Sequence, residues 1–197
     1  MLPRAARSYW LAKVRPILEY AAEIWAGDLP QILVSKAEKI QSDFARRILG
    51  LHNADGISNQ AILAELGLEP LRSRWYKLKL GYWRRIFTYK PSRLLREVIT
   101  IHRAQTAADP QTPGWCASTK RLLDIHNLHE AWDHPVSCAR QPKQQWKTKV
   151  YNAVDALANS ERENTMSQLT SLNQYIQLKD WRPTPRDRCF STSEQKN

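Results

Sequence analysis

The positively charged residues of this chain are concentrated in one segment. Residues 72–103 contain ten Lys or Arg and a single acidic residue, Glu97, which gives a net charge of +9. The rest of the chain contains 20 basic and 18 acidic residues, so its charges nearly balance. Such a segment favours contact with a polyanion, because neutralising phosphates releases their condensed counterions. The charge distribution therefore predicts that this segment contacts nucleic acid.

The long helix predicted within this segment places several cations on one face. Pro70 can open the helix and Pro91 stops it. At about 100° per residue, four cations that we call the basic stripe share an arc of about 100°: Arg74, Lys77, Arg84 and Arg85. Gly81 lies near the middle of this arc. Glycine costs a helix interior about 1 kcal/mol relative to Ala, and it permits close approach of another backbone.

We interpret the basic stripe as a surface that lies against a sugar-phosphate backbone. The predicted nucleic-acid-binding residues are the stripe, Gly81, and two cations beyond the helix, Lys90 and Arg93. The alternative is a solvated charged face on which Gly81 lets a neighbouring helix pack closely. The salt dependence of duplex binding separates the two interpretations.

The same helix is apolar on two other sides. The first apolar arc is expected to enter the core: Leu71, Trp75, Leu78, Tyr82, Ile86 and Tyr89. The second apolar arc is centred about 100° or more away: Tyr76, Leu80, Trp83 and Phe87. The helix should therefore be sandwiched, or one arc should meet a partner outside this chain. An exposed Trp83 or Tyr76 would stack on a sugar or base, although aromatic residues at this spacing are more often core residues.

Five potential metal ligands lie between residues 116 and 138: Cys116, His126, His129, His134 and Cys138. Tetrahedral zinc sites use paired ligands two to five residues apart on a loop that can close round the ion. His126 and His129 have an acceptable helical spacing, but the later intervals match no standard module. We therefore expect no metal site, and interpret these residues as surface histidines and small buried thiols.

The sequence contains none of the common catalytic or phosphate-binding motifs. G-x-S-x-G, the P-loop, G-x-G-x-x-G and H-E-x-x-H are all absent. Two-metal phosphoryl transfer needs closely placed carboxylates, and the sequence has no adjacent Asp-Asp pair. We expect no catalytic residue, no cofactor and no enzymatic activity for this chain by itself.

The elements that position these residues are predicted to be helices throughout. One helix should run from Pro16 to the break at Gly27, and another over residues 31–49. Ser58 is predicted to be the N-cap of a short helix closed by Gly67. The second helix carries an apolar stripe at helical spacing: Leu33, Ala37, Ile40, Phe44 and Ile48.

We predict an all-α fold, a helical bundle in two sub-bundles with a disordered C-terminal tail. Residues 106–115 contain two prolines and a glycine and read as a linker. This linker separates a basic helical region, 1–105, from a second helical region, 116–180. The polar residues 181–197 read as a flexible tail.

The composition of the chain indicates where in the cell the protein is expected. No apolar run approaches the roughly 18 to 20 residues of a membrane span, and the first residues lack the apolar core of a signal peptide. Cys116, Cys138 and Cys189 are an odd number without a C-x-x-C pair, which predicts free thiols. We expect an intracellular protein without membrane contact, in the nucleus or in a cytoplasmic ribonucleoprotein.

Several short motifs resemble those of a known family. Residues 14–25 read VRPILEYAAEIW, followed by EKIQ at 38–41 and ARRILG at 45–50. Residues 65–71 then read ELGLEPL, directly before the basic helix. Their order and spacing resemble the segment that follows the palm in reverse transcriptases of LINE-type non-LTR retrotransposons, over about residues 10 to 100.

The resemblance implies that residues 1–105 correspond to the thumb of such a polymerase. The fingers and the palm, with its F/Y-x-D-D turn, have no counterpart in this sequence. The resemblance thus implies a non-catalytic fragment that grips the template-primer, with an RNA/DNA duplex or other nucleic acid as partner and possibly a palm domain in trans. The alternatives are a helical protein-interaction module that docks a partner through the second apolar arc, and a non-functional retroelement remnant.

Overall fold

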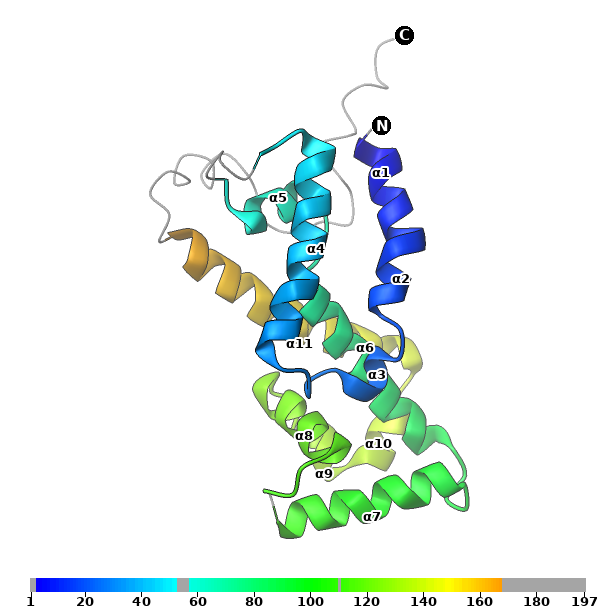
Figure 1. Ribbon diagram of the computed structural model, residues 1–197. Coiled ribbons are helices and arrows are strands. Elements are labelled where there is room, and N and C mark those ends of the chain that lie inside the picture. Colours follow the sequence, from blue (N-terminus) through cyan, green and yellow to red (C-terminus); the bar gives the residue numbers. More distant parts are fainter. Residues whose placement is uncertain (1–2, 53–56, 110, 168–197) are drawn as a thin grey trace. The chain divides into compact units, whose positions relative to one another are not determined.

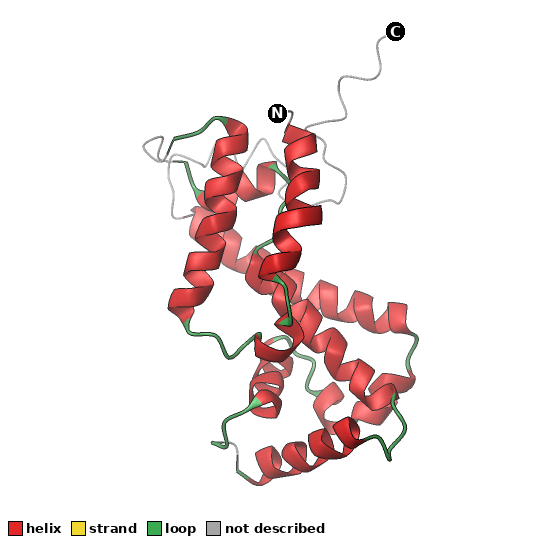
Figure 2. Cartoon of the chain, turned by 45° about the vertical axis from the view of Figure 1, so that its right-hand side comes forward, coloured by secondary structure: helices red, strands yellow, loops and turns green. Residues whose placement is uncertain are grey.

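The computed structural model describes residues 3–52, 57–109 and 111–167 (Figure 1). Within these ranges every regular element is helical and no strand occurs (Figure 2), so the predicted all-α fold is confirmed. The elements are α1 (Pro3–Tyr9), the π-helical turn η1 (Trp10–Val14), α2 (Arg15–Leu18), α3 (Ala22–Trp25), α4 (Gln31–Leu49), α5 (Asn59–Glu65), α6 (Leu71–Thr88), α7 (Leu94–Ala108), α8 (Trp115–Ile125), α9 (Glu130–Asp133), α10 (Pro135–Arg140) and α11 (Lys143–Ser167). The predicted tail, 181–197, lies outside the described residues.

The chain divides into two compact units along different lines from the predicted regions. Of the described residues, unit 1 takes 3–20, 31–52, 57–71 and 158–167, and unit 2 takes 21–30, 72–109 and 111–157. Helices α6 and α7 were expected in the first region, but they pack with the helices that follow them. The predicted linker is also shorter than expected, because α7 continues to Ala108 and α8 begins at Trp115.

In unit 1, the core forms around Trp10, whose ring packs against Phe44 at 4.6 Å between centroids. The predicted N-cap of α5 is confirmed, since the Ser58 hydroxyl accepts a hydrogen bond from the Gln60 amide. Gly50 and Gly67 follow α4 and α5 with φ of 68° and 60°, the left-handed conformation that glycine adopts without strain.

The buried face of α4 differs from the predicted apolar stripe. The residues that α4 buries are Val34, Gln41, Ser42 and Ala45. The predicted stripe members Leu33 and Ile40 are instead 45% and 49% exposed. The amide of Gln41 donates to the Glu69 carbonyl at 3.0 Å, so the polar and small face of α4 lies against the turn before α6. Two members of the stripe, Phe44 and Ile48, do pack against the core of unit 1, so the periodicity found only part of the buried face.

The helix predicted from Pro16 to Gly27 is interrupted. Ala21 adopts the left-handed conformation with φ of 54° and separates α2 from α3. This conformation costs a residue with a Cβ roughly 1–2 kcal/mol. The result is a four-residue helix, α3, that belongs to unit 2.

In unit 2, α6 is sandwiched, which confirms one of the two arrangements expected for it. Most of the second apolar arc is fully buried, with Leu80 and Trp83 at 0% exposure. The Trp83 ring stacks on Trp132 with 5.3 Å between centroids and an interplanar angle of 11°. The Trp83 indole also donates to the Ala131 carbonyl at 3.1 Å. The core of unit 2 therefore forms around the second apolar arc of α6.

A buried lysine attaches the segment after α3 to this core. The ammonium of Lys79 is 0% exposed and donates to the Ala26 carbonyl at 2.6 Å, to Asp28 at 3.0 Å and to the Ser118 hydroxyl at 2.6 Å. The Ser118 hydroxyl in turn donates to Asp28 at 2.7 Å. We call these four residues the Lys79 cluster. It fixes residues 26–28 between α6 and α8, and it removes one cation of the basic segment from the surface.

Candidate nucleic-acid interface

Three of the four cations of the basic stripe hold α6 against the helices that follow it. The Arg74 guanidinium donates to the Tyr151 hydroxyl at 2.9 Å. Lys77, whose side chain is 3% exposed, donates to Asp155 at 2.6 Å. Arg84 donates to the carbonyls of Ala139 and Gln141. The stripe is thus largely an interhelical face, an arrangement that neither sequence interpretation foresaw.

The other cations that were predicted to bind nucleic acid are exposed. The Arg85 side chain is 57% exposed, and its guanidinium lies 4.6 Å from the centre of the Tyr82 ring. Lys90 and Arg93 lie on the connection between α6 and α7, and both are exposed. The Arg93 guanidinium covers the Tyr89 ring at 3.9 Å. These three side chains can reach a phosphate from the surface without breaking a contact in the core.

A pocket of about 440 Å³ opens between the exposed part of α6 and the first turns of α11. We call it the α6–α11 groove. Five cations line it, namely Lys77, Arg84, Arg85, Lys143 and Lys147. The other lining residues are Glu23, Leu78, Gly81, Tyr82, Thr88, Trp146, Val150 and Tyr151. Lys77 is paired with Asp155, so the remaining four cations against Glu23 give the groove a net positive potential, because a cleft concentrates the field of the charges that line it.

Gly81 forms part of the floor of this groove. A Cβ placed on Gly81 would meet no heavy atom of the described structure within 4 Å, apart from the backbone of its own helix and its chain neighbours. A neighbouring helix therefore does not press against Gly81, which was the alternative to the predicted backbone contact. The missing side chain leaves space in the groove where a ligand can approach the helix backbone.

Two cations of the groove, Lys143 and Lys147, were not singled out from the sequence. Both are exposed and lie four residues apart on α11, so they share a face of that helix. Tyr151 continues this face, and its ring lies under the Lys147 ammonium at 5.2 Å. The i, i+4, i+8 spacing was the available signal, but nothing in the sequence indicated that this face lies beside the basic stripe.

The aromatic residues proposed for base stacking occupy different positions. Trp83 lies in the core and cannot reach a base, so that hypothesis was wrong for Trp83. Tyr76 is half-buried, and its ring lies 5.9 Å from the ring of His126. The expectation that these aromatic residues belong to the core is confirmed for Trp83.

The potential metal ligands between residues 116 and 138 are dispersed. Cys116 and Cys138 are buried free thiols in the core of unit 2, and burial raises the pKa of each thiol to about 11. His126 is buried, whereas His129 and His134 are exposed. Among the described residues, no three His, Cys, Asp or Glu side chains are grouped so that they could hold a metal ion.

No protein-family model, curated protein or solved structure matches the chain. Of the helices that the structure describes, none is both long enough and apolar enough to cross a membrane.

Burial of His126 makes the stability of unit 2 depend on pH. Burial lowers the pKa of His126 below the usual value of 6.5. As the pH falls below about 6.5, the unfolded chain takes up a proton that the folded chain still excludes, so stability present at neutral pH is lost. We expect the Tm to fall more steeply between about pH 7 and pH 5 in the wild type than in His126→Gln, measured by circular dichroism. Parallel profiles would contradict this prediction.

Proposed function

We propose that this chain is a non-catalytic nucleic-acid-binding protein whose α6–α11 groove holds the sugar-phosphate backbone of a duplex. The observation that carries the proposal is the groove itself, with five cations, one acid and a floor that lacks a side chain at Gly81. Cations that line a groove attract a phosphate chain regardless of base sequence. The proposed activity is gripping, with no chemical step.

The cations of the groove divide into two roles under this proposal. Arg85, Lys143 and Lys147 are exposed and bind phosphate oxygens directly. Arg84 keeps its carbonyl partners and adds positive potential from the groove wall, whereas Asp155 offsets the charge of Lys77. Outside the groove, Lys90 and Arg93 extend the contact along the connection after α6.

The resemblance to LINE-type reverse transcriptases supports the same proposal. A thumb grips the template-primer duplex while the palm performs the chemistry, and the motifs that carry the resemblance precede α6 directly. Under this proposal the chain is a fragment of an RNA-directed DNA polymerase that binds an RNA/DNA duplex, and a palm domain in trans is a second partner.

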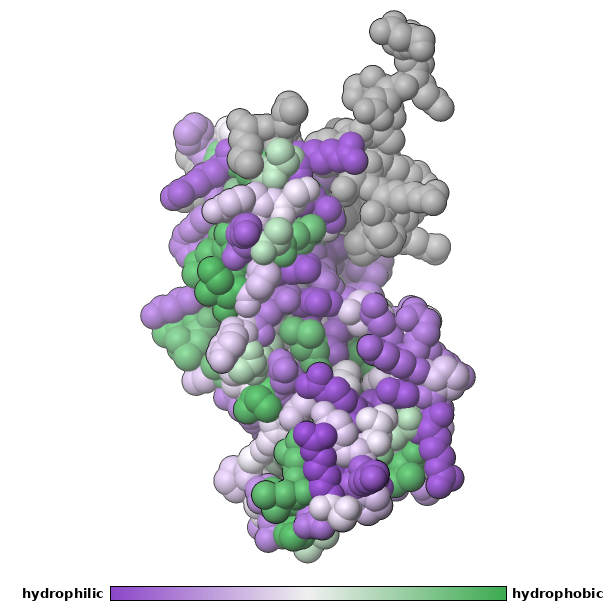
Figure 3. All heavy atoms as spheres, turned by 90° about the vertical axis from the view of Figure 1, so that its right-hand side faces the viewer, coloured by the Kyte–Doolittle hydropathy of each residue, from purple (hydrophilic) through white to green (hydrophobic). Residues whose placement is uncertain are grey.

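The surface that the protein-interaction alternative would use for docking is not accessible. The second apolar arc lies in the core of unit 2, with Leu80, Trp83 and Phe87 all buried. Other exposed hydrophobic residues occur, and on the face shown in Figure 3 they form separate patches among hydrophilic side chains. A retroelement remnant without function stays a second candidate, and the absence of a cooperative melting transition would favour it.

The proposal is tested by removing the three exposed cations of the groove. In Arg85→Gln/Lys143→Gln/Lys147→Gln, the slope of log K against log salt should become shallower by about 2 to 3, since each neutralised phosphate contributes 0.7 to 0.9. Binding to a labelled RNA/DNA duplex is measured by fluorescence anisotropy between about 0.05 and 0.3 M salt. The matched control, Lys13→Gln/Lys36→Gln/Arg47→Gln, removes the same charges from exposed positions of unit 1 and should keep the wild-type slope.

A pair of substitutions at Gly81 separates groove shape from charge. Gly81→Ala places a methyl group in open space and should leave duplex binding unchanged while raising helix propensity by about 1 kcal/mol. Gly81→Leu fills the floor of the groove and should weaken binding. A wild-type slope in the triple Gln variant, together with wild-type affinity in Gly81→Leu, would mean that the groove is not the binding surface.

A further inference from the structure

The α6–α11 groove contains one acidic side chain, Glu23, among its lining residues. Glu23 lies on α3, and its carboxylate is 35% exposed. The nearest ion-pair partner that the structure gives it is the Arg85 guanidinium at 4.0 Å, which is longer than a hydrogen bond. A carboxylate oxygen can therefore accept a hydrogen bond from a ligand in the groove.

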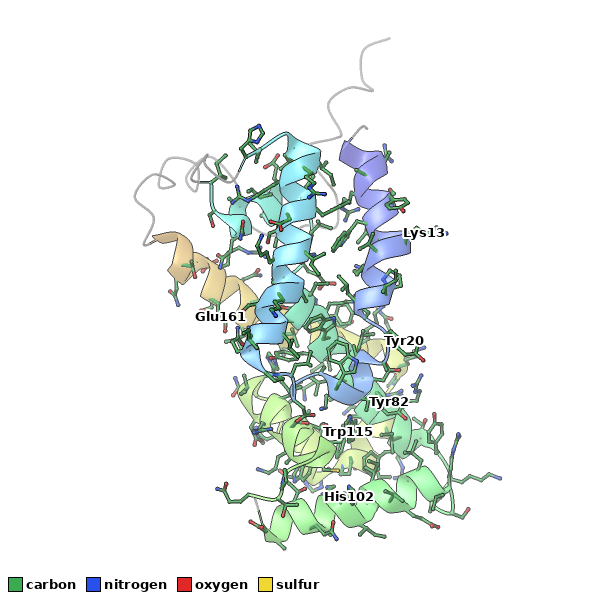
Figure 4. All side chains as sticks on the ribbon, in the orientation of Figure 1. Lys13, Tyr20, Tyr82, His102, Trp115 and Glu161 are labelled. Carbon is green, nitrogen blue, oxygen red and sulfur yellow. The ribbon has the colours of Figure 1, made fainter. Side chains whose placement is uncertain are left out.

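The position of Glu23 is fixed from two sides. The Trp115 indole donates to the Glu23 carbonyl at 2.8 Å, and the Tyr82 ring packs edge-on against Trp115 at 6.0 Å. Figure 4 labels Tyr82 and Trp115 next to α3. Just beyond α3, the ammonium of Lys79 holds the Ala26 carbonyl and the Asp28 side chain. The backbone that carries the acid is thus held beside the groove in the folded structure.

An acid at this position weakens binding of a DNA backbone more than binding of an RNA backbone. A carboxylate repels phosphate, and the sugar-phosphate backbone of DNA offers it no hydrogen-bond donor. Each ribose of RNA carries a 2′-hydroxyl that can donate, and this group allows a protein to distinguish RNA from DNA at a given site. The net cost of Glu23 to backbone binding is therefore offset when the bound strand is RNA.

We propose that Glu23 makes the α6–α11 groove selective for a ribose-containing strand by accepting a hydrogen bond from a 2′-hydroxyl. This inference rests on the proposed function, because it requires that a nucleic-acid backbone occupies the groove. It extends that function by naming the strand that the groove faces and the residue that selects it.

The experiment compares hairpin duplexes of one sequence made of RNA, of 2′-fluoro RNA and of DNA. The 2′-fluoro duplex keeps A-form geometry but cannot donate a hydrogen bond. Wild-type chain should bind RNA about 3- to 10-fold more tightly than 2′-fluoro RNA, the effect of a single hydrogen bond. In Glu23→Ala the ratio should fall to about one, whereas Glu23→Gln, which keeps an acceptor oxygen, should retain most of it.

Affinity ratios are the readout because both substitutions remove a negative charge and raise the affinity for every duplex. The matched control, Glu97→Ala, removes an exposed acid on α7 and should keep the wild-type ratio. Equal wild-type affinity for RNA and 2′-fluoro RNA, or an unchanged ratio in Glu23→Ala, would overturn the inference and leave the proposed function standing. Absence of salt-dependent binding to every duplex would overturn the proposed function itself.

Discussion

Replacing Trp83 with Ala is expected to lower the free energy of unfolding by about 3–5 kcal/mol, the cost of deleting a large buried aromatic side chain. Trp83 is completely buried, packs against Phe87, Trp115 and Trp132, and donates a hydrogen bond to the Ala131 carbonyl. The substitution leaves a cavity in the middle of the unit 2 core and an acceptor without its donor. The measurement is guanidinium-induced unfolding followed by circular dichroism.

Trp83→Phe is the control for this prediction. Phe keeps much of the ring packing and loses the hydrogen bond, so its cost should be well below that of Ala. Because Trp83 does not line the groove, Trp83→Phe should also bind duplexes with the wild-type salt slope. A loss of less than about 1 kcal/mol in Trp83→Ala, at the level of an ordinary substitution, would be incompatible with a buried Trp83.

Replacing Lys79 with Met is expected to cost about 3 kcal/mol of unfolding free energy, because the groups that Lys79 bonds lose their buried donor. Asp28 keeps a weaker partner, the Arg121 guanidinium at 3.8 Å. Met keeps the apolar stem but leaves the Ala26 carbonyl, Asp28 and Ser118 without their shared donor. Burial lowers the pKa of Lys79, and the interaction with Asp28 opposes that shift. Breaking a fully buried ion pair costs about 3–5 kcal/mol. We expect a cost at the lower end of this range because the Asp28 side chain is 38% exposed and can be hydrated.

The double variant Lys79→Met/Asp28→Asn provides the control. It removes the carboxylate that has lost its nearest cation together with the lysine, so it should be more stable than Lys79→Met alone. Chemical denaturation of the two single variants and the double variant gives the coupling energy between the residues. Strictly additive effects would show that Lys79 and Asp28 do not interact in the folded protein.

Local signals in the sequence predicted the bounds of α6 well. Pro70 and Pro91 bracket a helix that runs from Leu71 to Thr88, and Ser58 caps α5 as predicted. Such features depend on the backbone within a few residues and can be read from a short window. The uninterrupted helix predicted from Pro16 failed where packing overrides local preference, whereas the predicted linker is present but shorter.

The candidate site was only half predictable, because it depends on which helix covers the basic stripe. Helical periodicity grouped Arg74, Lys77 and Arg84 on one arc and placed Gly81 among them. It carried no information about α11, which supplies Asp155 and Tyr151 as partners and two lysines to the groove. Pairing between segments some 70 residues apart is decided by tertiary packing, which single-sequence patterns do not encode.

The attachment of α3 has a consequence for the dynamics of the groove. A helix of four residues has too few internal hydrogen bonds to be stable alone, so segment 21–30 depends on Trp115 and the Lys79 cluster for its place. Segments held by few contacts open with a smaller free energy than the whole fold. The wall that carries Glu23 is therefore expected to detach transiently while α6 and α11 stay together. During such an opening the groove keeps its cations and loses its acid, so the proposed selection of a ribose-containing strand would require the closed state.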